Sequence, residues 1–269
     1  EFRRVLFRSY SDGDQSFEWS PDSKWILSEF IGIGGWNNKD IVLLNADGKG
    51  EMHNLTESGY SDGNAKWVLG GKAMVWFSDR AGYRSHGSWG AQYDAYIMFF
   101  DVDAYDRFRM NKEDLALLEE AEKAEKAEKE KAEKKKKEDK KGDKKKDAKG
   151  KKDGEEEKKE EVKPLKFDLD NRFDRIVRLT VNSSFMGDAV LTPKGDKLYY
   201  LAAFESGYDL WEHDLKENST KILLKGVGGG SLLPDKKGEN IFMCTGGGMK
   251  KIEIAGSKTT PIADRKSVV

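Results

Sequence analysis

Short apolar segments alternate with turns rich in Gly, Asp, Pro, Asn and Lys along most of the chain. The segment from Tyr10, "YSDGDQSFEWSPDSKWILSE", has the same opening and the same apolar, turn, apolar order as the segment from Tyr60, "YSDGNAKWVLGGKAMVWFSD". Outside the charged run at 119–161, no stretch keeps apolar residues at the 3.6-residue spacing of a helix. The pattern predicts an all-β chain built from repeated units.

Each unit has four predicted strands. In the first they are "SFEWS", "WILSEFI", "DIVLLNA" and "EMHNLT". Two later units begin at Asp188 and Ser231, and their Lys-Gly-acid turns at 194–196 and 237–239 align with each other. Repeats of about 40 to 45 residues with four strands are typical of β-propeller blades. The sequence therefore predicts a partial β-propeller of about four four-stranded blades.

The second unit carries a long insertion. Its fourth strand, "RIVRLT" at 175–180, matches "EMHNLT" at 51–56, so residues 103–174 are expected to lie between the third and fourth strands. The predicted blades span 10–56, 60–181, 188–224 and 230–262. Residues 10–102 are predicted to contain the first blade and part of the second. Residues 175–262 are predicted to contain the fourth strand of the second blade and the third and fourth blades.

The insertion is predicted to begin as a helix and to end disordered. Asn111 can cap the helix, Glu113 and Asp114 suit its first turn, and Leu115, Leu117 and Leu118 form a short apolar anchor. Glu-before-Lys pairs extend the expected helix to about residue 141, and glycines and mixed charges follow. Between 119 and 161, 18 Lys are matched by 17 Asp and Glu, which favours a solvated spacer over a nucleic-acid-binding arm.

The two termini differ from the rest in composition. Residues 1–9, "EFRRVLFRS", and 264–269, "DRKSVV", resemble translated sequencing adapters, and we exclude them from fold reasoning. The chain is accordingly expected to be a fragment of an environmental bacterial gene. Its N-terminus does not indicate a compartment, although a periplasmic or secreted location is preferred over a cytoplasmic one. No window approaches the roughly 20 apolar residues of a membrane span.

Catalytic and metal-binding motifs are not recognisable in the sequence. The three histidines, His53, His86 and His213, have no nucleophile elbow or evident acid partner, and His53 and His213 fall in predicted strands. The single cysteine, Cys244, lies in an apolar run and is expected to be inert. Acidic segments at 101–106 and 168–171 could bind Ca²⁺ but lack an EF-hand glycine, so we predict no metal and no cofactor.

One loop has the composition of a binding surface. The segment 79–94, "DRAGYRSHGSWGAQYD", is longer than a blade turn requires. Aromatic and Arg side chains are preferred interface anchors. Packing against the next blade explains the loop equally well. The candidate peptide-binding residues are Arg80, Tyr83, Arg84, His86 and Trp89.

Several of these strings together resemble a known family. The turns "SPDSK" and "TPKGDK" look like TolB-type propeller repeats. The strings "SDRAGYRSHGSWGAQYDAYIMFFDVDAYDRFRMNKEDLALLEE", "VRLTVNSS" and "LYYLAAFESGYDLW", with the Lys/Glu insertion, resemble bacterial tricorn-like serine peptidases. The resemblance covers residues 10–262 and concerns only the family's non-catalytic propeller.

The resemblance implies a function for the parent protein. It implies that the propeller gates or binds unfolded peptides for a downstream PDZ domain and protease core, whose catalytic residues lie outside this chain. Two alternatives stay open: a TolB-like interaction scaffold without enzymatic activity, and the propeller of a prolyl-oligopeptidase-like enzyme. Expected partners are peptide substrates and the downstream domains, with no nucleic acid and no membrane span; a homo-oligomer is left open.

Overall fold

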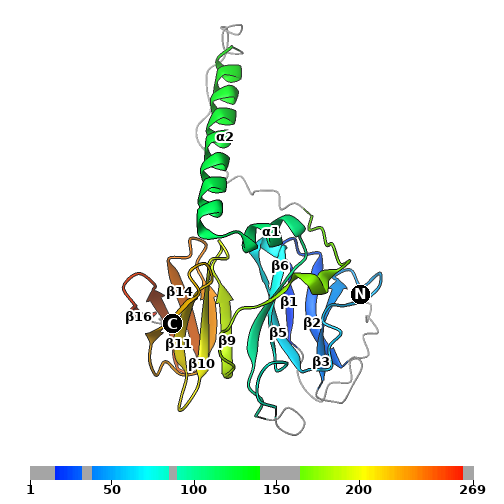
Figure 1. The fold of residues 1–269 in the computed structure, drawn as a ribbon, viewed down its shortest axis with the longest axis vertical. Coiled ribbons are helices and arrows are strands. Elements are labelled where there is room, and N and C mark those ends of the chain that lie inside the picture. Colours follow the sequence, from blue (N-terminus) through cyan, green and yellow to red (C-terminus); the bar gives the residue numbers. More distant parts are fainter. Residues whose placement is uncertain (1–15, 32–37, 85–89, 140–163, 263–269) are drawn as a thin grey trace, which may run out of the picture. The chain divides into compact units, whose positions relative to one another are not determined.

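The computed structural model describes residues 16–31, 38–84, 90–139 and 164–262, whose strands form four antiparallel sheets of four strands each. Within each sheet the strands pair in chain order, as in a meander. Sheets that are consecutive in sequence are also neighbours in space (Figure 1). This architecture confirms the predicted all-β partial propeller, and we call the sheets blades one to four.

The blades have the following strands. Blade one contains β1 (Phe17–Trp19), β2 (Trp25–Ile31), β3 (Lys39–Asn45) and β4 (His53–Asn54). Blade two contains β5 (Asp62–Val68), β6 (Ala73–Ser78), β7 (Asp94–Phe99) and β8 (Ile176–Arg178). Blade three contains β9 (Phe185–Leu191), β10 (Lys197–Ala203), β11 (Asp209–Asp214) and β12 (Ser219–Leu224). Blade four contains β13 (Ser231–Pro234), β14 (Asn240–Thr245), β15 (Gly248–Glu253) and β16 (Lys258–Ile262).

The middle blades bury both faces of their sheets. Along β6, Met74 and Trp76 pack against blade one, whereas Val75 and Phe77 pack against blade three. Alternate residues of a strand point to opposite faces, so a strand covered on both sides reads as a continuous apolar run. The string "AMVWFS" of β6, in which every residue is buried, is such a run.

Carboxylates tie the first strands of neighbouring blades together. Asp188 on β9 accepts hydrogen bonds from Lys66 Nζ at 2.6 and 2.7 Å and from Leu232 N at 2.7 Å. Blade one is joined to blade two from its second strand, because Glu29 Oε1 on β2 accepts the N–H of Asn64 at 2.7 Å. Asp188 is almost fully buried, and its charge is satisfied by partners from three blades.

Two helices follow β7 in the chain. In α1 (Val102–Arg109), Asp101 Oδ1 accepts the Ala104 N–H at 2.7 Å at the start of the helix. The Phe108 ring packs against that of Phe99, with centroids 5.0 Å apart and the planes tilted by 47°, and Lys216 Nζ donates to the Phe108 carbonyl at 2.6 Å. These contacts attach α1 to blades two and three.

The helix α2 (Lys112–Asp139) belongs to a unit separate from the blades. Asn111 Oδ1 accepts the Asp114 N–H at 2.8 Å, which is the N-cap that the sequence predicts. None of the helices in the described ranges combines the length and apolar character needed to cross a membrane. The predicted disorder after residue 142 lies outside the described residues up to position 163.

The chain returns to the propeller through residues 164–175, which we call the strap. Its Phe167 ring lies 5.0 Å from Trp25 of blade one, and 5.9 and 5.3 Å from Trp67 and Phe100 of blade two. Its backbone is held as well, because Asp22 Oδ2 accepts the Leu165 N–H at 2.9 Å. The sequence placed the strap within the insertion, but the structure packs it against the core of blades one and two.

Two arginines at the end of the strap fix it further. Arg172, in the short 3₁₀ helix η3 (Arg172–Arg175), donates to the carbonyls of Asn54 at 2.9 Å and Leu55 at 3.1 Å. Arg175 is buried and donates to the carbonyls of Phe99 and Asp168. The fourth strand of blade two, β8, follows directly, so the strap sets its position.

We predict that the charged part of the insertion contributes nothing to the folding of the propeller. Deleting Glu119 to Glu161 removes no apolar residue other than Ala. The free energy of unfolding, measured by urea denaturation, should change by less than about 1 kcal/mol, as for surface changes. A loss above about 2 kcal/mol, the scale of core damage, would contradict this prediction.

The strap, in contrast, should be needed for stability. Phe167→Ala should lower the free energy of unfolding by about 3 kcal/mol, because it empties a site between three aromatic rings. Phe173→Ala, which truncates a strap residue that is 46% exposed, is the matched control and should cost less than about 1 kcal/mol. Equal losses in the two variants would mean that the strap does not pack as described.

Candidate functional site

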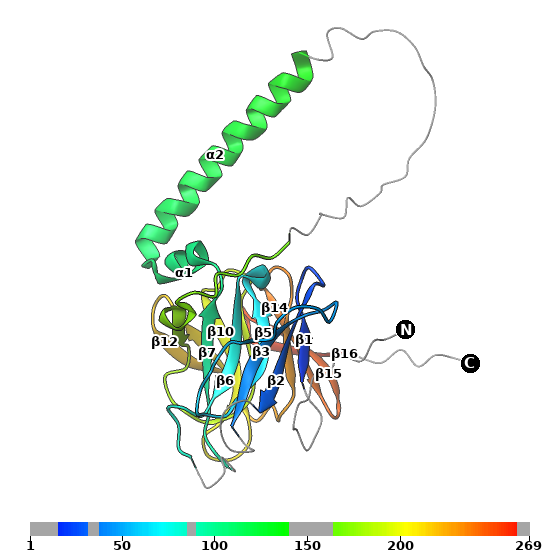
Figure 2. The same ribbon diagram turned by 90° about the vertical axis from the view of Figure 1, so that its right-hand side faces the viewer.

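The two ends of the blades differ in their connections. Because β6 runs into the loop at 79–93 and β7 runs out of it, this loop lies at the same end as the connections at 32–38 and 204–208. We call this the loop end. The strap and α1 lie at the other ends of the same strands, which we call the strap end (Figures 1 and 2). The sequence-predicted binding loop thus lies at the opposite end of the strands from the strap and α1.

Arg80 is held by a buried carboxylate. Its Nη2 lies 3.2 Å from Asp62 Oδ1 and 3.3 Å from Oδ2, and its Nε donates to Ser78 Oγ at 2.9 Å. The guanidinium also lies over the Tyr96 ring, 4.9 Å from its centroid. Asp62 is fully buried, so this ion pair fixes the start of the loop.

Arg84, which also lies near Tyr60, has a similar arrangement. Its Nε lies 3.2 Å from Oδ2 of the buried Asp79, whose Oδ1 accepts the Ser61 N–H at 2.9 Å. The guanidinium carbons of Arg80 and Arg84 lie 5.8 and 5.0 Å from the centroid of the Tyr60 ring. The two arginines therefore order Tyr60 as well as the loop.

Tyr83 is presented outwards between these anchors. Its side chain is 68% exposed, while its carbonyl accepts the Gln92 N–H at 2.8 Å. The neighbouring Gly82 is sterically required, because a Cβ there would lie 2.1 Å from the Gln92 carbonyl oxygen. The loop therefore holds an aromatic side chain in solvent on a closed and well-supported backbone.

A recurrent Asp–Thr arrangement orders the rest of the loop end. Asp40, at the second position of β3, accepts from Thr56 Oγ1 at 3.1 Å. Asp94, at the start of β7, accepts from Thr180 Oγ1 at 2.6 Å. Asp94 also forms a 2.7 Å ion pair with Arg178. In these two blades an aspartate near the start of the third strand thus fixes the segment after the fourth.

The phenols nearby are not acidic. Burial raises the pKa of Tyr93, and the Asp79 carboxylate raises it further. Burial also raises the pKa of Tyr96, as does the carboxylate of Asp94. Both phenols therefore stay protonated at neutral pH and can act only as neutral hydrogen-bonding groups.

The structure brings three of the five predicted residues together. Arg80, Tyr83 and Arg84 share one loop, and both arginines use their charge within the blade. His86 and Trp89 lie outside the described residues. Peptide binding by this loop therefore stays a prediction, and within it Tyr83 is the predicted side chain that is most open to solvent.

The histidines within the described ranges form no catalytic pair with a serine side chain. His213 is buried, and its Nδ1 lies 2.7 Å from Thr220 Oγ1. Burial lowers the pKa of His213, which keeps the ring neutral near pH 7. No hydrogen bond joins the ring of His53 to a serine in this part of the chain.

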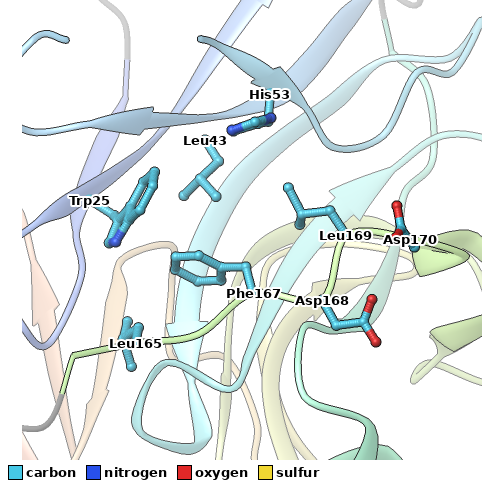
Figure 3. A pocket seen from close by; sticks show the side chains of 8 residues that line it. All are labelled: Trp25, Leu43, His53, Leu165, Phe167, Asp168, Leu169 and Asp170. Carbon is cyan, nitrogen blue, oxygen red and sulfur yellow. The ribbon is translucent and has the colours of Figure 1, made fainter. Parts of the chain in front are cut away.

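A groove at the strap end was not predicted from the sequence. It has a volume of about 460 Å³ and lies between blade one and the strap (Figure 3). The residues that line it are Trp25, Leu43, His53, Leu165, Phe167, Asp168, Leu169 and Asp170. The apolar–polar alternation in "LKFDLD" at 165–170 was the available signal, because it is typical of an extended segment with one packed face.

Comparison with known proteins gave matches by structure only. No family model and no curated protein matches the sequence. The structure of TolB from Acinetobacter baumannii has a TM-score of 0.51 and 15% identity over 91% of this chain and 42% of that one. The tricorn protease structure has a TM-score of 0.56 and 9% identity over 93% of this chain and 22% of that one.

A structure described as a prolyl endopeptidase has a TM-score of 0.47 and 11% identity, over 94% of this chain and 29% of that one. At the identities of TolB and the tricorn protease, the likeness shows the fold, which is a TolB-type β-propeller. The chain spans less than half of the TolB structure and about a fifth of the tricorn protease structure.

We predict that the Asp79 carboxylate is required to order the loop. Asp79→Asn leaves a neutral group opposite Arg84 and should lower the free energy of unfolding by about 2 kcal/mol. The Gln92 amide, which closes the loop onto Tyr83, should exchange its hydrogen faster, as measured by mass spectrometry or NMR. Asp47→Asn, in an exposed turn, is the control and should change neither quantity. Unchanged exchange at Gln92 in the Asp79 variant would show that the loop is ordered by other contacts.

Proposed function

We propose that this chain is a non-catalytic propeller module that binds extended polypeptide at its loop end and serves a larger serine peptidase of the tricorn-like class. The observation that carries the proposal is Tyr83, which is 68% exposed on a loop whose two arginines pair with buried carboxylates. The likeness to the tricorn protease structure over 93% of the chain, together with the resemblance of the sequence strings, supports the choice of class.

The ordered backbone around Tyr83 favours binding of flexible peptides. An extended peptide loses conformational entropy when it binds, so a surface that is already ordered avoids a second entropic cost. Arg80 and Arg84 order this surface through their contacts with buried carboxylates and with the Tyr60 ring. Tyr60 and Tyr83 provide aromatic surface for the peptide. A tyrosine contributes a large contact area with only two side-chain torsions to fix.

The module is proposed to act within a longer chain. On β1 of blade one, Phe17 and Trp19 are 65% and 52% exposed, and Leu233 and Met249 are exposed on blade four. In a propeller these positions are covered by a neighbouring blade. We infer that the peptidase reaction takes place in other domains, and that this propeller contributes by selecting or gating substrates.

A TolB-like interaction scaffold is the second candidate, and the TM-score of 0.51 to TolB supports it. The two functions differ in what they bind. A scaffold recognises the surface of a folded partner, whereas a gating module binds unfolded chains of many sequences. Binding that is insensitive to whether the polypeptide is folded would favour the scaffold.

The proposal predicts that the purified chain binds unfolded polypeptide without cleaving it. Fluorescein-labelled, reduced and carboxymethylated lactalbumin should bind in fluorescence anisotropy, and native lactalbumin should not. Tyr83→Ala should raise the dissociation constant about fivefold to tenfold, as expected for an exposed aromatic anchor. The Tyr83→Ala substitution should weaken binding of peptides of about 15 residues more than binding of tripeptides, because the longer peptides cover more of the surface.

Phe173→Ala is the matched control, since Phe173 is an exposed aromatic residue at the strap end. It should leave the dissociation constant unchanged. If the two variants bind alike, or if the chain binds native and unfolded lactalbumin equally, the gating function is wrong. Hydrolysis that co-purifies with the chain and is lost in His86→Ala would contradict the non-catalytic assignment.

A further inference from the structure

The groove at the strap end combines an apolar body with charge of one sign. Five of its eight lining residues are apolar, and the only formally charged ones are Asp168 and Asp170. No Lys or Arg lines it. Pockets that bind small molecules also combine apolar side chains with a few polar groups, and 460 Å³ is within their usual size.

We propose that this groove binds a small organic cation that carries an apolar or aromatic body. The proposal is independent of peptide binding at Tyr83, because the groove and the loop lie at opposite ends of the blades. The ligand class follows from the two ends of the groove. Figure 3 shows the Trp25 and Phe167 rings towards one end and the two carboxylates towards the other.

The aromatic end suits an apolar body. The rings of Trp25 and Phe167 meet edge to face, with centroids 5.0 Å apart and an interplanar angle of 85°. Phe167 is fixed from behind by Phe100 at 5.3 Å, so the wall is already formed before any ligand arrives. An aromatic or branched apolar group placed here would bury surface against preorganised rings.

The acidic end suits a single positive charge. Asp170 forms no hydrogen bond or ion pair within the described ranges of the chain. Asp168 has Arg175 on one side, at 3.7 Å, and its own side chain is 47% exposed. One carboxylate is therefore without a partner and the other is only partly compensated, which favours a cation and disfavours an anion.

His53 completes the wall between the two ends. His53 lies in the short strand β4, and its backbone pairs with that of Leu43 in β3. Its ring has no hydrogen-bond partner within the described residues. A larger side chain at this position would fill the groove without removing a contact that holds the blade. His53 is therefore the position at which the groove can be blocked with least effect on the fold.

The test uses three probes of similar shape and different charge on the full chain, at pH 7 and low ionic strength. They are 2-phenylethylamine, 2-phenylethanol and 3-phenylpropionate, and binding is measured by calorimetry. The amine should bind at least tenfold more tightly than the acid, with the alcohol between them. The capped dipeptide acetyl-Phe-Lys-amide tests whether the bound cation can also be a lysine side chain of a peptide, since the groove would accept the free amine and the dipeptide alike.

Variants locate the binding. Asp170→Asn and Asp168→Asn should each raise the dissociation constant of the amine up to about tenfold, because each removes a charge-assisted contact without changing shape. Asp174→Asn is the matched control, since Asp174 is an exposed strap residue outside the groove. His53→Trp should abolish binding while the melting temperature stays near that of the parent chain. Tyr83→Ala should leave amine binding unchanged.

Three results would overturn the proposal. They are the absence of amine binding at millimolar concentration, equal affinity for the amine and the acid, and binding that survives His53→Trp in a folded protein. The Tyr83→Ala variant changes only the loop end. A failure of amine binding would therefore not count against the proposed peptide binding, and a failure of peptide binding would not count against the groove as a cation site.

Discussion

The burial of both faces of each middle sheet is the constraint on which the structure depends. A four-stranded meander with apolar residues on both sides cannot stand alone in water, so it must pack between two others. In β10, Leu198 and Tyr200 pack towards blade two, and Tyr199 and Leu201 pack towards blade four. The cores lie between the blades rather than within them. Each blade therefore depends on its neighbour for stability, and the order of the blades follows the order of the chain.

This packing leaves the strand ends as the places where polar groups can be arranged. At the loop end, buried carboxylates such as Asp40, Asp62 and Asp94 are satisfied by hydroxyl groups, backbone N–H groups and arginines. A buried charge is tolerated only when it is paired in this way, and the pairing in turn fixes the loops. The same arginines that looked available for ligands in the sequence are thus used to hold the surface on which Tyr83 stands.

The sequence predicted the repeats well because their signals are local. Alternation and turn residues define each meander, and the match of "RIVRLT" to "EMHNLT" located β8 after a long interruption. The role of the strap could not be predicted, because Phe167 packs on Trp25 and Phe100, far away in sequence. The partners of Arg80 and Arg84 were missed for a related reason: a sequence shows that a loop is rich in arginine but not which buried carboxylates face it.

The two ends of the propeller differ in how the chain connects to them. At the loop end, ion pairs within blade two hold the backbone on either side of Tyr83, so a ligand at Tyr83 contacts a part of the loop that is already ordered. At the strap end, the groove is formed partly by a segment that reaches the blades only after the whole insertion. A ligand between Trp25 and Asp170 would touch blade one and the strap at once. It would therefore stabilise the docking of the strap by its binding free energy, whereas a peptide at Tyr83 would leave that docking unchanged.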